Sequence, residues 1–93
     1  MSSKNDVTPI RSDLTIYLYM RSRTSNHFQG QAHSVTSINT TGVFDILPMH
    51  ANFVTLVKDY LIVDRGLATE KRIEFKTAVM SAIGNKIDVY VGI

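Results

Sequence analysis

Apolar and polar residues alternate along much of the chain from residue 14 onward, which is the pattern of β-strands that bury one face. The first alternating run places four apolar residues on one side: Leu14, Ile16, Leu18 and Met20. The closing run repeats the pattern with Ile87, Val89, Val91 and Ile93. The chain is therefore expected to begin and end its folded part with a half-buried strand.

Short strands are also predicted between these two runs. They cover residues 27–32, 33–38, 43–47, 53–57, 60–64, 72–77 and 78–83. Residues 53–57 are apolar on both faces, which suits a central strand or one sealed between two layers. Residues 78–83 also suit a helix, but the segment is short and ends at Gly84-Asn85, so a strand is predicted. Charges alternate along residues 72–77, which indicates a solvated face or an edge strand.

Turn residues separate the predicted strands. Residues 39–42, Asn-Thr-Thr-Gly, form a turn cluster, because Asn and Gly tolerate positive φ. Lys58-Asp59 is predicted to be a turn between two strands. Pro48 is expected to end its strand, because it lacks a backbone N–H and has a fixed φ. Gly84-Asn85 predicts a two-residue hairpin.

About nine short strands without a helix of any length predict an all-β fold, an antiparallel β-sandwich. Residues 1–12 are polar, lack a period and contain Pro9, so they are expected to form a flexible N-terminal tail. Residues 13–93 are expected to form a single domain.

Composition excludes several classes of protein. The net charge is only +2, from 10 basic and 8 acidic residues, and the basic residues are spread along the chain, which disfavours nucleic-acid binding. The absence of cysteine excludes a disulfide framework and thiolate metal sites. No apolar run approaches the roughly 20 residues needed to cross a bilayer, and no signal-peptide core is present. We expect a soluble, unexported chain without direct membrane insertion.

Candidate catalytic residues are few. His27, His33 and His50 lack the spacing of a zinc site, so exposed or locally hydrogen-bonded histidines are expected, and His50 is placed to brace the corner after Pro48. Two carboxylate pairs flank turns, Asp59 with Asp64 and Glu70 with Glu74. Solvated charges are the favoured interpretation of these pairs over general acid–base work.

Nucleotide and nucleophile motifs are also missing. There is no Gly-x-Ser-x-Gly elbow and no phosphate-binding loop. We therefore expect a protein that is not an enzyme, with no catalytic, cofactor-binding or metal-binding residues. Tyr17, Tyr19 and Tyr90 fall on the opposite parity to the predicted core. Their expected role is to cover the second face of the sheet, with contact to bases or to a protein partner as the alternative.

One segment resembles a known family. Residues 42–51 read Gly-Val-Phe-Asp-Ile-Leu-Pro-Met-His-Ala, which resembles the Gly-x-Phe-x-Ile-Leu-Pro-Gly-His-Ala signature in the N-terminal domain of the epsilon subunit of F-type ATP synthases. Phe28-Gln29-Gly30 is similar to the family's Phe-x-Gly, and Gly84-Asn85 is similar to its last hairpin. The resemblance covers roughly residues 13–93.

This resemblance implies a non-catalytic subunit of the central stalk, or rotor, of a proton- or sodium-translocating F-type ATP synthase. Such a subunit couples the gamma subunit to the membrane ring of c subunits, as a peripheral part of the complex on the cytoplasmic side of the inner or plasma membrane. Contact with gamma is expected on a sheet face or edge. Contact with the ring is expected at two tips, formed by Asn39, Thr40, Thr41, Gly42 and Val43 and by Pro48, Met49, His50 and Ala51.

The chain departs from the family pattern at both tips. Met49 stands where the family usually has Gly, which raises the steric cost of any positive φ and adds an exposed apolar side chain. Val43 stands where an acidic or polar residue often follows the turn glycine. The helical hairpin of many epsilon subunits has no counterpart within the 93 residues, so neither braking nor ATP sensing is carried over. The alternative is a free-standing or self-associating β-sandwich adaptor with another partner.

Overall fold

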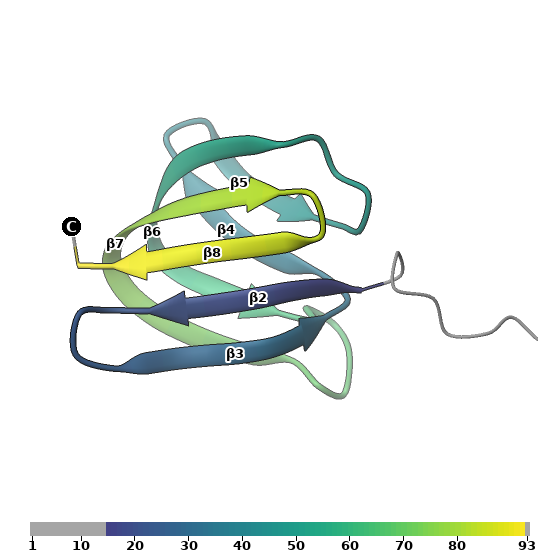
Figure 1. Cartoon of the computed structure of the whole chain (residues 1–93), viewed down its shortest axis with the longest axis horizontal. Coiled ribbons are helices and arrows are strands. Elements are labelled where there is room, and N and C mark those ends of the chain that lie inside the picture. The colour runs from purple at the N-terminus through teal and green to yellow at the C-terminus, as the bar shows by residue number, and fades with distance from the viewer. Residues whose placement is uncertain (1–14, 93) are drawn as a thin grey trace, which may run out of the picture.

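The computed structural model describes residues 15–92, which form seven β-strands and no helix (Figure 1). The strands are β2 (Ile16–Arg21), β3 (Asn26–Ala32), β4 (Val35–Asn39), β5 (Gly42–Ile46), β6 (Phe53–Val63), β7 (Lys71–Ile83) and β8 (Lys86–Val91). The all-β prediction is confirmed. The expectations for residues 1–12, Leu14 and Ile93 lie outside the described residues.

All seven strands belong to one hydrogen-bonded sheet, in the order β3-β2-β8-β7-β6-β4-β5. Five of the neighbouring pairs are antiparallel, but β2 and β8 run parallel, with Leu18 opposite Ile87 and Met20 opposite Val89. The prediction of a purely antiparallel fold was therefore wrong. A parallel pair needs a long connection, and here the five strands between β2 and β8 provide it.

Two predicted strand breaks do not exist, which is why seven strands replace the expected nine. Residues 53–63 form one strand of 11 residues and residues 71–83 form one of 13. The predicted turn at Lys58-Asp59 is a β-bulge instead: Lys58 lies opposite Thr77 and Asp59 lies opposite Phe75, so Lys76 is an extra residue in β7. Asp59 has a φ of 73°. A bulge bends a strand without ending it.

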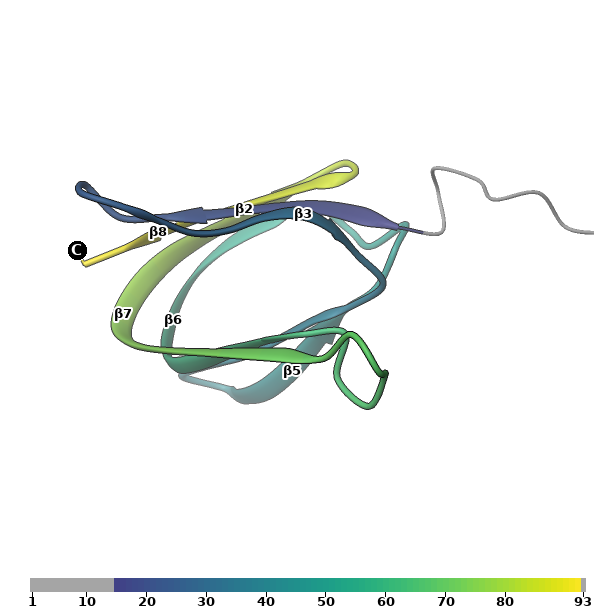
Figure 2. The same cartoon turned by 90° about the horizontal axis from the view of Figure 1, so that it is seen from below.

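The bulge explains how one sheet encloses a core. Ile73 and Phe75 pack against the core before the extra residue, and Ala78, Met80 and Ala82 are buried after it. Figure 2 shows β6 and β7 curving from the wall that contains β2, β3 and β8 to the opposite wall, near β5. The two walls are thus parts of one continuous curled sheet. The predicted sandwich of two separate sheets is therefore not confirmed, because the strand pairing gives one sheet.

The core lies between the two walls of the curled sheet. Its buried members are Ile16, Leu18, Met20, Ala32, Val35, Ile46, Val57, Leu61, Val63, Ala78, Met80, Ala82, Ile87 and Val89. The alternation predicted for the first and last strands is confirmed, since Ile16, Leu18, Met20, Ile87 and Val89 are all fully buried. Within residues 15–92 there is no helix long and apolar enough to span a membrane.

The short-range turn predictions are also confirmed. Ile83 pairs with Lys86 across Gly84-Asn85, and Gly84 adopts a φ of 59°, as the hairpin motif requires. β5 ends at Ile46, two residues before Pro48. Within the described residues, the charged first half of β7, residues 71–76, has β6 as its one ladder partner, because β8 pairs from Ala78 onward. This half of β7 is an edge, as its charges indicated.

Candidate docking surface

The first predicted tip is the turn between β4 and β5. The side-chain Oδ1 of Asn39 accepts hydrogen bonds from the backbone N–H and from the hydroxyl of Thr41, at 2.9 and 2.7 Å. The side-chain amide of Asn39 also donates to Thr55 Oγ1 at 3.2 Å, which fixes the turn to β6. Thr40 and Thr41 are exposed. Gly42 has a φ of 125° and Val43 is 61% exposed, so the tip presents an apolar side chain beside hydroxyls.

The second predicted tip is the corner at Pro48, Met49, His50 and Ala51. Met49 has a φ of 68° and is 82% exposed, so it occupies a conformation that favours glycine and points a long apolar side chain into solvent. The exposed apolar side chain expected of Met49 is therefore confirmed, and its positive φ is the conformation for which a steric cost is expected. His50 donates from Nδ1 to the carbonyl oxygen of Ala51 at 2.8 Å, and its ring packs edge-on against Phe53. The bracing role expected for His50 is confirmed.

The structure does not bring these two tips together. They lie at opposite ends of β5, because the turn precedes Gly42 and the corner follows Ile46. An extended strand of that length spans about 13 Å, at roughly 3.3 Å per residue. A partner that touches both tips must therefore extend along β5.

A larger surface lies on the outward side of the wall formed by β2, β8 and the adjoining halves of β7 and β6. Side chains there alternate with the buried residues of the same strands. We call this surface the outer face; its outward-pointing members are Tyr17, Tyr19, Arg21, Val54, Leu56, Val79, Ser81, Ile83, Lys86, Asp88 and Tyr90. Ladder register aligns them in rows: Leu56 lies opposite Val79, Val79 opposite Tyr90, and Tyr90 opposite Arg21.

The aliphatic part of the outer face is well exposed. Val54 is 63% and Leu56 is 61% exposed. Of the two interpretations of residues 53–57, the central strand is confirmed, because β6 lies between β7 and β4, and the strand sealed between two layers is wrong. The run is apolar on both sides because one side faces the core and the other faces solvent. An exposed apolar patch of this kind marks an interaction surface more often than a scattered single residue does.

The aromatic part of the outer face is organised around one arginine. The guanidinium of Arg21 lies 4.6 Å from the centre of the Tyr19 ring and 5.7 Å from that of Tyr90, and it pairs with Asp88 at 3.5 Å. Tyr17 accepts a hydrogen bond from the side-chain amide of Gln29 at 2.6 Å. Tyrosine and arginine are enriched among the residues that dominate protein interfaces. The structure thus places Tyr17, Tyr19 and Tyr90 on the second face of the sheet, as predicted.

Asp64 organises the loops at one end of the sheet. Its carboxylate accepts hydrogen bonds from the backbone N–H groups of His33 and Ser34 and from the hydroxyl of Thr69. Burial raises the pKa of Asp64, but the hydrogen bonds from Thr69, His33 and Ser34 together outweigh it, so its pKa lies below the ordinary value of 3.8. His33 Nδ1 lies 3.5 Å from the same carboxylate. This is a structural anchor for the connection between β3 and β4.

A second charged cluster lies on the opposite wall. The hydroxyl of Thr36 donates a hydrogen bond to one carboxylate oxygen of Asp45, and Arg65 pairs with the other at 2.9 Å. The hydrogen bond from Thr36 lowers the pKa of Asp45, burial opposes this, and Arg65 lowers it further. Both partners of the ion pair are about half exposed, so the pair fixes geometry more than it adds stability.

The four residues of the two predicted carboxylate pairs have separate surroundings. Asp59 lies at the bulge and Asp64 among the loop hydrogen bonds, while Glu70 accepts from the backbone N–H of Gly66 and Glu74 pairs with Arg72. Across residues 15–92, no three His, Cys, Asp or Glu side chains are grouped so that they hold a metal ion.

Comparison with known proteins shows the fold of this chain but not its family. The sequence matches no protein-family profile and no curated protein. The structure is similar to a chain of the Euglena gracilis mitochondrial ATP synthase, solved with OSCP, F1 and the c-ring, with a TM-score of 0.75 and 14% identity over 97% of this chain and 56% of that one. It is also similar to a chain of the Tetrahymena thermophila mitochondrial ATP synthase central stalk and c-ring, with a TM-score of 0.64 and 7% identity over 82% of this chain and 62% of that one. The chain spans little more than half the length of these neighbours.

Proposed function

We propose that this chain is a non-catalytic subunit of the central stalk of an F-type ATP synthase, of the epsilon type, and that it joins the gamma subunit to the ring of c subunits. One observation carries the proposal: 97% of the chain superimposes on a chain from an ATP synthase solved with its c-ring. The Gly-x-Phe-x-Ile-Leu-Pro-x-His-Ala sequence of residues 42–51 agrees with this placement independently of the superposition.

The described surface suits a coupling role. A torque-transmitting subunit needs two separate contacts on a rigid body, one toward each neighbour. The outer face offers a broad apolar and aromatic surface around Leu56 and Tyr90, and the two tips at the ends of β5 offer a second, smaller one. We assign the outer face to gamma and the two tips to the ring. In this assignment the chain is a peripheral part of the complex and lies on the side of the membrane from which the central stalk projects.

The tips differ in chemistry from those expected of the family. Val43 and Met49 replace polar or small residues with exposed apolar side chains. Contact with the ring is then apolar, and the loops of its c subunits should carry apolar residues opposite Val43 and Met49. Met49 at positive φ fits this role, because strained residues persist where function requires them.

The experiment that tests the proposal is co-purification with the gamma subunit from the same organism. The proposal predicts a stable one-to-one complex on gel filtration. A well-folded chain that does not associate with gamma would overturn it. Self-association of the chain alone, at the same concentration, would instead support the free-standing adaptor.

A further inference from the structure

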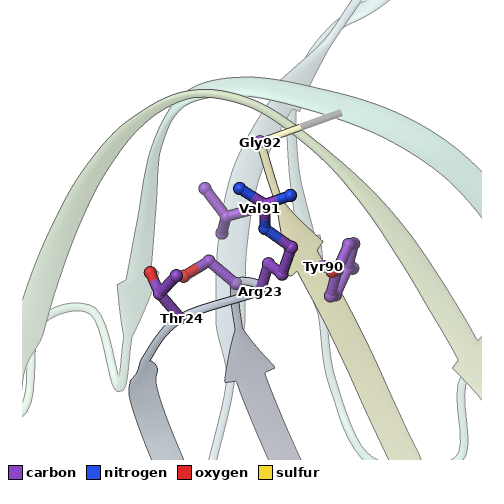
Figure 3. A pocket seen from close by; sticks show the side chains of 6 residues that line it. Arg23, Thr24, Tyr90, Val91 and Gly92 are labelled. Carbon is purple, nitrogen blue, oxygen red and sulfur yellow. The ribbon is translucent and has the colours of Figure 1, made fainter.

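A shallow cavity of about 370 Å³ lies at the border of the outer face. It is lined by Ser22, Arg23, Thr24, Tyr90, Val91 and Gly92, which come from the turn between β2 and β3 and from the end of β8. In Figure 3 the side chain of Arg23 reaches from the turn toward Val91, with the ring of Tyr90 on its other side. The cavity therefore has a cationic group between two apolar walls.

Arg23 differs from the other arginines of residues 15–92. Arg21 pairs with Asp88, Arg65 with Asp45, and Arg72 with Glu74. Within residues 15–92, Arg23 makes no ion pair, and none of the residues that line the cavity carries a carboxylate side chain. A guanidinium in such a place keeps its five N–H donors available for a planar anion, which it binds in a bidentate manner.

The walls of the cavity are fixed in place. On the turn side, the backbone N–H of Ser22 donates to the carbonyl oxygen of Ser25 at 2.8 Å, and the two serine hydroxyls lie 3.3 Å apart. On the strand side, the N–H of Gly92 donates to the carbonyl oxygen of Thr77 at 3.0 Å, which holds the end of β8 against β7. A site that is formed before binding loses less conformational entropy when a ligand enters.

The cavity is continuous with the aliphatic row of the outer face. Tyr90 lines the cavity and lies opposite Val79, which lies opposite Leu56. Adjacent strands are about 4.8 Å apart, so the row from Tyr90 to Leu56 measures about 10 Å. A polyproline II segment has three residues per turn and rises about 3.1 Å per residue, so its side chains at positions i and i+3 share one face and lie about 9 Å apart. A ligand whose anionic end fills the cavity meets an apolar surface about three residues further along.

We propose that this cavity is a recognition site for an acidic residue of a partner protein, and that the partner segment has the form Glu-x-x-Leu in the polyproline II conformation. The carboxylate pairs with the guanidinium of Arg23, the hydroxyl of Thr24 donates a further hydrogen bond, and the aliphatic residue packs on Val79 and Leu56. The site exists on the isolated chain. It is therefore independent of whether the partner is gamma or another protein.

The test is an NMR titration of the isolated chain with the peptide acetyl-Glu-Ser-Ser-Leu-amide. The proposal predicts saturable shifts at millimolar peptide for the backbone amides of residues 22–24 and 90–92 and for Val79. Arg23→Gln should weaken binding at least tenfold, and Arg23→Lys should weaken it less, because Lys keeps the charge but loses the bidentate geometry. Arg72→Gln is the matched control and should leave binding unchanged, since Arg72 pairs with Glu74 and stacks on Tyr60 elsewhere.

Two further probes separate the sources of anion binding. Acetyl-Gln-Ser-Ser-Leu-amide should not bind, and inorganic phosphate should bind more weakly than the acidic peptide. The proposal is wrong if the peptide gives no saturable shifts, or if Arg23→Gln binds it as wild type does. It is also wrong if phosphate binds as tightly as the acidic peptide, because the site is then a general anion site.

Discussion

The carboxylate of Asp64, at the end of β6, accepts a hydrogen bond from the backbone N–H of His33, in the connection between β3 and β4. The backbone N–H of Asp64 in turn donates to the carbonyl oxygen of Ser34 at 3.0 Å. Sequence-distant loops are thus fixed together at one end of the sheet. These hydrogen bonds fix the two residues before β4 in place. The free energy of unfolding should therefore depend on the carboxylate of Asp64.

Asp64→Asn should destabilise the fold by about 2–3 kcal/mol, because hydrogen bonds to a charged group that is only 5% exposed are lost or weakened. Asp59→Asn is the matched control. Asp59 also has a positive φ, of 73° against 55° for Asp64, and asparagine tolerates both, but Asp59 is exposed. Its substitution should change the free energy of unfolding by less than about 0.5 kcal/mol. Urea denaturation of both variants measures the difference, and equal effects would contradict the anchor role.

The same carboxylate predicts the pH dependence of stability. The pKa of Asp64 in the folded chain lies below 3.8, so its contribution is fully present above that value and is lost as the pH falls through the folded pKa. Asp45, whose pKa is also lowered, acts in the same direction. The gap in unfolding free energy between wild type and Asp64→Asn should therefore close as the pH is lowered from 7 toward 2. A gap that stays constant over this range would show that the lost hydrogen bonds do not depend on the charge.

Met49→Gly should stabilise the isolated chain. A non-glycine residue in the left-handed region costs about 1–2 kcal/mol, which is more than the roughly 0.5–1 kcal/mol that glycine adds through the entropy of the unfolded chain. Met49 is 82% exposed, so little packing is lost. Thermal denaturation should show a higher midpoint for Met49→Gly and an unchanged one for Met49→Leu. A lower midpoint for Met49→Gly would mean that the side chain packs on the fold.

A carboxylate placed on the outer face and one placed at a tip should weaken binding to different partners. Leu56→Glu, on the outer face, should weaken binding to gamma at least tenfold, because it buries an unpaired carboxylate in an apolar contact. Val43→Glu has the same 61% exposure but lies at the tip of β5, so it should leave gamma binding intact and weaken attachment to the ring. Calorimetry with gamma and sedimentation with purified rings measure the two effects. Equal loss of gamma binding in both variants would contradict the division of the surface.

Local patterns predicted much of this fold. The alternation of Ile16, Leu18 and Met20, the hairpin at Gly84-Asn85 and the end of β5 before Pro48 all depend on short-range chemistry, and all are present. The joining of residues 53–63 into one strand was missed, because Lys58-Asp59 has the polarity of a turn. Lys58 and Asp59 lie at a bulge, and the strand continues through them because residues on both sides pair with β7.

The outer face was missed for a related reason. Periodicity shows that Val54 and Leu56 lie on one side of a strand, but which side another layer covers depends on how the whole sheet curls. The parallel pairing of β2 with β8 is equally non-local, since it joins the two ends of the described chain. The signal available in the sequence for a docking surface was a strand with apolar residues on both faces, of which the core covers only one.

The central claim is tested most directly by purifying this chain, with an affinity tag, from its own organism and examining what accompanies it by cryo-electron microscopy. The account predicts an intact ATP synthase in which the outer face lies against gamma and the tips at Val43 and Met49 lie against the ring. A chain that purifies without synthase subunits, or that occupies a position away from the central stalk, would contradict it.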